Sequence, residues 1–251
     1  MALWRYIPPL VAPGTVQMAI DAWLLDRHLA GDPPSLRFYT WSPPALSLGY
    51  HQRRIPPHWH DLTWNGTAID LVRRPTGGRG VLHWGDLTYA LVMSPPSENR
   101  KQAYRQVCQF LVEGWRSLGV ELDYGSAGRG YIGNPDCFST ATAADLVLTT
   151  GTKWIGSAQL WRSRALLQHG SIQLAPDRDL FARVFGTQLY REGAVCVEIP
   201  RAIAALKAAA SRCFDATFVD RPLTKTEWNA IGDLKNSVSL GTFERTEGQE
   251  T

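Results

Sequence analysis

The sequence predicts an α+β fold with a largely antiparallel sheet. Apolar residues recur at helical spacing in a few long segments, and short β-type runs lie between them. The two kinds of segment are mixed along the chain without the strict strand–helix alternation that builds a parallel sheet. A length of 251 residues allows one large domain or two small ones, and we expect one main domain.

The N-terminal part of the chain is expected to form a helix followed by short strands. Residues 16–29 have helical apolar spacing, which ends at Gly31. Two β-type runs on either side of Pro43-Pro44 predict a hairpin or two adjacent strands. The strand candidates of this part are residues 36–41, 45–50, 68–74 and 87–93.

A second helix is expected to begin at Ser97 and to end at Gly119. Its apolar positions recur at the spacing of one helix face and are Tyr104, Val107, Cys108, Leu111, Trp115 and Leu118. Because Cys108 lies on this face, we expect a buried, unreactive thiol.

The second half of the chain predicts three consecutive strands and two helices. The strands are expected over residues 145–150, 153–161 and 165–174, with a turn near Arg162-Ser163. An Ala-rich helix follows Pro200 with Cys213 on its apolar side, and residues 224–227 have the spacing of a capping box that begins a last helix. We therefore expect a main domain over 1–190, a small helical extension over 191–235 and a flexible tail over 236–251.

The composition argues against several functional classes. No apolar run reaches the roughly 18 residues of a membrane span, and the N-terminus lacks the pattern of a signal peptide. The formal charge of +3 is spread along the chain, which argues against nucleic-acid binding, although a mildly basic rim could attract an acidic protein. The four cysteines are far apart, and His58-Trp59-His60 lacks a third ligand, so no metal site is expected. We therefore expect a cytoplasmic protein, and since nothing argues for a dimer, a monomer.

A glycine-rich segment, RRPTGGRGVLH at residues 73–83, is the first candidate for chemistry. Three glycines in four residues let the backbone approach a ligand, and they leave amide N–H groups that can face a carbonyl or an anion. The flanking arginines could bind phosphate. A glycine-rich hairpin turn is the alternative explanation.

Two later segments suggest a pocket wall. In GTKWIGSAQ at residues 151–159, Lys153 precedes the small residues 156–158, which leave room for an acyl chain or for a neighbouring helix. A lone histidine is more often structural than catalytic, but in LQHGSI at residues 167–172 the place of His169 between Gln168 and Gly170 points toward a pocket wall.

Cys137 is the thiol expected to be reactive. Its surroundings, GNPDCFS, have the composition of a loop, so it does not lie on a regular apolar face as Cys108 does. A nearby ammonium lowers the pKa of a thiol, and Lys153 lies 16 residues downstream, where it could fold back to Cys137. An incidental loop cysteine is the alternative.

In this order, RRPTGGRGVLH, GTKWIGSAQ and LQHGSI resemble the signature blocks of the biotin and lipoate protein ligase superfamily, most closely its lipoate-protein ligase and octanoyltransferase branch. An N-terminal block agrees with this resemblance, which spans residues 3–175 and continues loosely to 235. The block consists of Met18-Ala19-Ile20-Asp21, Leu24-Leu25, Leu36-Arg37-Phe38-Tyr39, Trp41, Ser47-Leu48-Gly49-Tyr50 and Gln52.

Cys137-Phe138 ahead of Lys153 is similar to the cysteine-dependent octanoyl-[acyl-carrier-protein]:protein N-octanoyltransferases of this branch. Three departures from the family pattern concern the surroundings of the cysteine and the glycine segment. The cysteine–lysine spacing is about one residue longer than in the family, which a loop can absorb. Gly80 stands where the family has Ala, and residues 139–144 lack the Pro-Ser-x-Tyr that often follows the cysteine.

The resemblance implies a biotin synthetase and class II aminoacyl-tRNA synthetase-like core with helices flanking a mixed sheet. It also implies transfer of an octanoyl group from octanoyl-acyl carrier protein, through a Cys137 thioester, to a lysine of a lipoyl domain or of the glycine cleavage H protein. Lys153 would stabilise the thiolate, amides at Gly77-Gly78 or at Cys137 would hold the oxyanion, and no cofactor is needed. The implied catalytic residues are Cys137 and Lys153, and the implied substrate-binding residues are Arg74, Thr76, Gly77, Gly78, Arg79, Gly80, His83, Gly156, Ser157, Ala158, Gln159, His169 and Gly170.

Three alternatives stay open at this point. The chain could be a lipoate-protein ligase that needs ATP and Mg²⁺, because a glycine segment suits phosphate as well as a carbonyl. It could be an amidotransferase that moves octanoate between lipoyl domains, or an acyl or lipoate binder without catalysis. A biotin ligase is disfavoured, because the basic glycine-rich loop of those enzymes is not present in its usual form.

Overall fold

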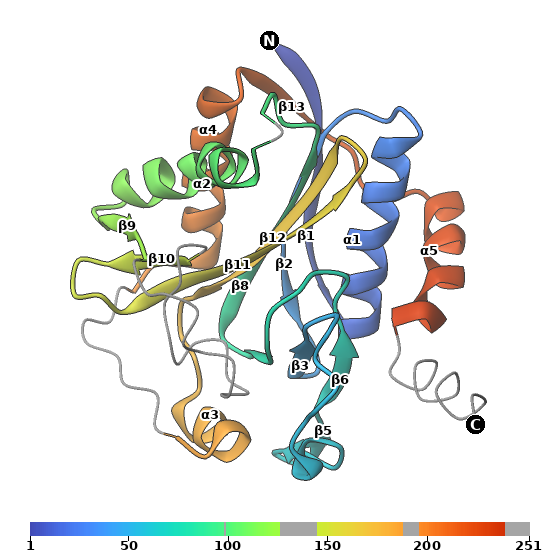
Figure 1. The fold of residues 1–251 in the computed structure, drawn as a ribbon, viewed down its shortest axis with the longest axis vertical. Helices are drawn as coiled ribbons and strands as arrows, with labels where there is room; N and C mark the ends of the chain where they lie inside the picture. Colours follow the sequence, from blue (N-terminus) through green and yellow to red (C-terminus); the bar gives the residue numbers. More distant parts are fainter. Residues whose placement is uncertain (98, 126–144, 188–195, 239–251) are drawn as a thin grey trace.

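The computed structural model describes residues 1–97, 99–125, 145–187 and 196–238. Within these ranges, eight strands form one large sheet in the order β13-β1-β2-β8-β12-β11-β10-β9 (Figure 1). In that order the strands are Ala216–Asp220, Ala2–Ala12, Ser35–Trp41, Asp86–Met93, Ala165–Gln173, Lys153–Arg162, Asp145–Leu148 and Leu122–Tyr124. Of the seven pairings, five are antiparallel, and β1 is parallel to both of its neighbours. The predicted α+β class with a largely antiparallel sheet is confirmed.

Helices cover both faces of this sheet. They are α1 (Gly14–Leu29), α2 (Arg100–Arg116), α4 (Ile199–Cys213) and α5 (Lys225–Val238). The pair α1 and α5 packs on one face, and the pair α2 and α4 on the other (Figure 1). Because side chains alternate across a strand, β8 serves both cores: Tyr89 and Leu91 face α2, whereas Ala90 and Val92 face α1.

A three-stranded sheet lies beside the large one and carries the glycine-rich segment. In it, β3 (Ala45–Leu48) pairs in parallel with β6 (Asp70–Arg73) and antiparallel with β7 (Val81–His83). Residues 74–80 connect β6 to β7. A short turn η1 (Pro57–Trp59) and helix α3 (Arg178–Phe185) complete a separate apolar cluster with this sheet, and β4 (Thr63–Trp64) pairs with β5 (Thr67–Ala68).

The pairing predicted for residues 36–41 and 45–50 is wrong. β2 lies between β1 and β8 in the large sheet, whereas β3 lies between β6 and β7 in the small one. Pro43 and Pro44 carry no N–H donor, so the chain cannot continue a ladder of the large sheet through them. Instead, the carbonyl of Pro44 accepts a hydrogen bond from the amide of Asp70 at 2.9 Å, which starts the pairing with β6.

Most other predicted elements are confirmed, with shifted ends. α2 begins at Arg100 instead of Ser97, because the side chain of Asn99 caps it by accepting from two backbone amides at 3.1 Å each. Thr224 and Glu227 form the predicted capping box, with side chain–amide distances of 3.3 and 2.8 Å. Cys108 is fully buried, and burial raises the pKa of its thiol to about 12, as an unreactive core cysteine requires.

The elements that were not predicted include β1, β9, α3 and β13. β1 contains Pro8-Pro9 and accommodates them at a shift of register between Ile7 and Leu10. β13 extends the large sheet beside β1. α5 reaches Val238, inside the segment expected as a tail, and residues 239–251 lie outside the described residues. The proposed division of the chain at residue 190 stays a prediction.

Among the helices described, none is long and apolar enough to cross a membrane.

Candidate functional site

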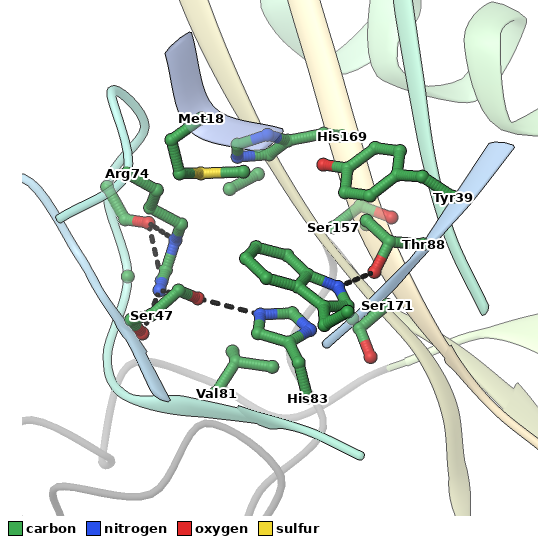
Figure 2. A pocket seen from close by; sticks show the side chains of 16 residues that line it. Met18, Tyr39, Ser47, Arg74, Val81, His83, Thr88, Ser157, His169 and Ser171 are labelled. Atoms are coloured by element: carbon green, nitrogen blue, oxygen red, sulfur yellow. Dashed lines mark hydrogen bonds between the residues drawn. The ribbon is translucent and has the colours of Figure 1, made fainter. Parts of the chain in front are cut away.

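A cavity lies between the large sheet, the small sheet and the start of α1 (Figure 2). About 450 Å³ of space free of atoms lies in it and at its open mouth. Its wall contains an aromatic pair, small residues of two neighbouring strands and the glycine segment. The lining residues are Met18, Tyr39, Trp41, Ser47, Arg74, Gly77, Gly78, Val81, His83, Thr88, Gly156, Ser157, Ala158, His169, Gly170 and Ser171.

Arg74 holds the glycine segment in shape from inside. Its guanidinium is buried and donates to the carbonyls of Ser47, Gly77 and Arg79 at 2.7, 2.9 and 2.8 Å. Gly78 has a positive φ of 102°, a conformation that L side chains rarely adopt. Arg74 therefore supports the cavity wall through these carbonyls, whereas the sequence suggested a phosphate ligand.

The segment is also pressed against β3. A Cβ atom on Gly49 would lie 1.9 Å from the carbonyl oxygen of Gly78, so only glycine fits at residue 49. The amide of Tyr50 donates to the carbonyl of Thr76 at 2.8 Å, which fixes the same contact from the other side. The glycine segment is thus a rigid wall between two strands, whose shape depends on a glycine outside it.

A buried chain of hydrogen bonds joins α1, β12 and the glycine segment. The Nδ1 atom of His169 lies 2.8 Å from a carboxylate oxygen of Asp21, and its Nε2 atom lies 2.6 Å from the hydroxyl of Thr76. The same carboxylate accepts from Tyr39 at 2.9 Å and lies 3.4 Å from the guanidinium of Arg37. Burial lowers the pKa of His169 more than Asp21 raises it, so the ring is neutral at neutral pH. A neutral ring that donates Nδ1–H to the carboxylate accepts at Nε2 from Thr76.

A second chain of the same kind joins β8, β7 and β3. His83 Nδ1 lies 2.8 Å from Asp86, and His83 Nε2 lies 2.8 Å from the hydroxyl of Ser47, as Figure 2 shows for the serine. Asp86 also accepts from Thr88 at 3.1 Å and from Ser171 at 2.6 Å. The ring of Trp41 stacks on His83 with centroids 3.9 Å apart. In both chains the two ring nitrogens are engaged, which suits a fixed wall.

The opposite wall is made of small residues on β11 and β12. Gly156, Ser157 and Ala158 line the cavity and pair with Ser171, Gly170 and His169 of β12. A Cβ atom on Gly170 would lie 2.7 Å from Gly156 O, Ser157 Oγ and Tyr89 Cε1. Tyr89 in turn shares a hydrogen bond of 2.8 Å with Ser157. The cavity has room at this wall because glycine, serine and alanine stand where larger strand residues would fill it.

Lys153 lies at the start of β11, on the same strand as the small residues. Its ammonium is buried and forms an ion pair of 2.8 Å with Asp145 on β10. Asp145 is paired directly with Gly156 between strands β10 and β11, so the ion pair of Lys153 and Asp145 lies next to the cavity wall. Cys137, the predicted nucleophile, lies outside the described residues, so its relation to Lys153 stays a prediction.

The structure brings most of the predicted binding residues together. Nine of them line the cavity: Arg74, Gly77, Gly78, His83, Gly156, Ser157, Ala158, His169 and Gly170. Four others lie around it without lining it. Thr76 is connected to the cavity through its hydrogen bond with His169, and Gln159 donates to Gln168 at 2.7 Å. Gly80 is buried at the start of β7, and the carbonyl of Arg79 accepts from Arg74.

Sequence reasoning did not assign to the site the residues that complete its wall or orient the histidines. These are Met18, Asp21, Tyr39, Trp41, Ser47, Val81, Asp86, Thr88 and Ser171. Five of them belong to the N-terminal block of the resemblance, which was the available signal. Asp86 and Thr88 gave none, because a carboxylate and a hydroxyl next to a strand are common on exposed faces.

Among the residues that the structure describes, no three His, Cys, Asp or Glu side chains gather in a way that could hold a metal ion.

Residues 13–226 match the family model described as the lipoyl protein ligase A/B catalytic domain. The chain is 36% identical over 195 residues to octanoyltransferase LipM of Geobacillus kaustophilus, covering 73% of this chain and 69% of that protein. It is 34% identical over 259 residues to octanoyltransferase LipM of Bacillus cereus, covering 98% and 91%.

Solved structures with a similar fold include two described as lipoate protein ligases. The putative lipoate protein ligase Ta0514 of T. acidophilum, with bound lipoic acid, has a TM-score of 0.77 at 23% identity and covers 94% of this chain and 95% of its own. Lipoate-protein ligase A bound with ATP has a TM-score of 0.77 at 24% identity, with the same coverage. These two likenesses support the fold.

Proposed function

The chain belongs to the lipoyl protein ligase A/B catalytic domain family and is an acyltransferase, and from this premise we propose that it transfers octanoyl from octanoyl-acyl carrier protein to a lipoyl-domain lysine. The glycine cleavage H protein is the other acceptor that we propose. The observation that carries the proposal is the similarity to relatives named octanoyltransferase, which extends over most of both chains.

The cavity supports an extended acyl chain as the ligand. Its small-residue wall belongs to β11, and Met18, Trp41 and Val81 line the cavity with apolar side chains. Burying a methylene group contributes about 0.8 kcal/mol, so a chain of octanoyl length gains several kcal/mol from such a wall.

We propose a mechanism of two half-reactions through Cys137. Its thiolate attacks the carbonyl carbon of the octanoyl thioester, an oxyanion forms, and the carbon–sulfur bond to the carrier breaks. The carrier leaves as a thiol after it takes up a proton. The ε-amine of the acceptor lysine then attacks the enzyme thioester, loses a proton and forms an amide, while the Cys137 thiolate is released.

Lys153 is proposed to hold negative charge during both steps. A buried ammonium needs a counter-charge, and Asp145 provides one at 2.8 Å. When a thiolate or an oxyanion forms within reach, the same ammonium stabilises it, and Asp145 keeps the lysine in position. No cofactor is proposed, because the incoming thioester is already activated.

The first test is the intact mass of the purified protein after incubation with octanoyl-acyl carrier protein in the absence of ATP. The expected result is one added octanoyl group that hydroxylamine removes and that a lipoyl domain discharges. Cys137→Ser should abolish the adduct, and the matched variant Cys196→Ser, at an exposed cysteine, should retain it.

Other outcomes identify the alternatives. Modification of a lipoyl domain only with octanoate or lipoate plus ATP and Mg²⁺ would indicate a ligase. Discharge only from an octanoylated lipoyl domain would indicate an amidotransferase, and tight acyl binding without turnover would indicate a binder.

The role of Lys153 is tested separately by the pH dependence of Cys137 alkylation. Lys153→Met should move the midpoint to higher pH, because a nearby cation is lost. The control is Lys207→Met on α4, which removes a different lysine–aspartate ion pair, the one between Lys207 and Asp220. An unchanged midpoint in Lys153→Met would contradict the proposed role.

A further inference from the structure

The cavity mouth is bordered by a stretch of chain that carries positive charge and no acid. No Asp or Glu occurs in residues 46–60 or in residues 71–85, although the chain has 23 acidic residues. Arg53 and Arg54 are exposed side chains of the first stretch. These two residues are called the cationic rim below.

Hydrogen bonds tie the backbone just before the cationic rim to Arg73 of the glycine segment. One Nη atom of Arg73 donates to the carbonyls of Gly49, Tyr50 and Gln52 at 2.9, 3.2 and 2.9 Å. The amide of Gln52 donates to Gly49 at 3.0 Å and closes a turn just before Arg53. The rim therefore begins on a supported backbone.

This turn packs against an exposed residue of the cavity wall. Gly78 lines the cavity and is itself exposed, so it marks the opening, and it is the residue against which Gly49 packs. A protein that delivers an acyl thioester into the cavity has to cover this opening. Its surface would then lie against the cationic rim.

The two substrates of the proposed function differ in how they meet positive charge. The acceptor brings a lysine that is an ammonium until it loses a proton ahead of its attack, and a cationic rim repels the ammonium. The donor brings a neutral thioester on a carrier, and an acidic carrier face is attracted to the rim over a Debye length of about 8 Å at physiological ionic strength. The charge of the rim thus favours the donor.

We propose that the cationic rim is the docking surface for the acidic face of the acyl-carrying donor protein. This inference rests on the proposed function and names the place where its first substrate binds. Docking there sets the rate of encounter and the KM for the carrier, whereas the chemistry at Cys137 stays the same for any thioester.

The experiment compares two thioester donors. Acylation of Cys137 is followed by intact mass with octanoyl-acyl carrier protein and with octanoyl-pantetheine, which has neither a protein nor a phosphate. The variant is Arg53→Glu/Arg54→Glu. The control, Arg201→Glu/Arg212→Glu, makes the same change of net charge at two exposed residues of α4, which covers the other face of the large sheet.

For the rim variant we expect kcat/KM with the carrier to fall about tenfold or more at low ionic strength. The loss should shrink as salt is added, because the Debye length falls to about 3 Å at 1 M. Octanoyl-pantetheine should react at the wild-type rate, and the control should behave as wild type with both donors. Arg53→Gln/Arg54→Gln should give an intermediate loss with the carrier.

Three results would overturn the inference while leaving the proposed function intact. One is an unchanged carrier kcat/KM in the rim variant. Another is an equal loss with both donors, which would mean that the substitutions act on the site. The third is a loss confined to discharge onto the lipoyl domain, which would make the rim an acceptor surface. If instead no thioester acylates the wild-type protein, the proposed function itself fails.

Discussion

Gly49→Ala is the sharpest test of the idea that packing outside the glycine segment shapes the cavity. The added methyl group would lie 1.9 Å from the carbonyl oxygen of Gly78 and 2.6 Å from its carbonyl carbon. Both are backbone atoms, so no side chain can turn away. An ordinary contact begins near 3.4 Å, and the two backbones therefore have to separate by more than an ångström.

The expected cost follows from that displacement. Overpacking a well-packed region costs about 1–3 kcal/mol, which for a chain of this size lowers the melting temperature by several degrees, at about 2–4 °C per kcal/mol. Because Gly78 lines the cavity, the wall moves as well, and a shift of about 1 Å in a site can cost about 100-fold in rate. We expect a loss of that order in kcat/KM for acylation.

The matched control is Gly77→Ala, one residue away from the contact. A Cβ atom on Gly77 meets no atom within 4 Å, and the residue has no positive φ. Its melting temperature should therefore equal that of wild type in a thermal scan. If Gly49→Ala also melts like wild type and acylates at a similar rate, the glycine segment is free to adjust and the reasoning is refuted.

Three further predictions concern groups away from the mouth. Asp21→Asn should destabilise the fold by about 3–5 kcal/mol in urea unfolding, because it leaves the buried guanidinium of Arg37 without a counter-charge. Asp26→Asn removes an exposed pair and should cost at most about 1 kcal/mol. The pKa of Glu227 is lowered to about 2 from 4.5, mainly by hydrogen bonding to Arg5, so its contribution to stability is complete above pH 4.5 and is lost as the pH falls toward 2. Glu227→Gln should flatten that part of the stability–pH curve, and an unchanged curve would argue against it. Iodoacetamide at pH 8 should alkylate exposed Cys196 in the folded protein and reach Cys108, whose pKa is about 12, only in denaturant, as peptide mapping would show.

The sequence predicted those parts of the fold whose pattern is local. The face of α2, the capping box at Thr224 and the hairpin of β11 and β12 each follow from spacing within a short segment. The prediction from sequence failed where pairing between strands far apart in the chain decides which sheet a strand joins. β2 and β3 are four residues apart but belong to different sheets, and β1 is a strand in spite of two prolines because it lies between two partners.

The candidate site follows the same division. The glycine segment and the small residues of β11 were found because their composition is unusual for a strand or a turn. Asp21 was missed as a site residue, since only the fold brings it to His169 across 148 positions of the chain. Asp86 is only three positions from His83, and it was missed because a carboxylate next to a strand is common. For Arg74 the residue was right and its contacts were not foreseen, because its carbonyl partners become neighbours only after the segment folds.

The two aspartate–histidine–hydroxyl chains explain how the cavity can stay open between two sheets. An apolar interface would close by packing, but small residues on one wall and glycines on the other leave little to pack. The chain from Asp21 through His169 to Thr76 ties α1 and the large sheet to the glycine segment, and the chain from Asp86 through His83 to Ser47 ties the large sheet to β3. Each holds its two sides at hydrogen-bond distance through an imidazole ring. The polar side chains that look catalytic by type thus act as struts, and the space that they keep open is where the acyl chain is proposed to bind.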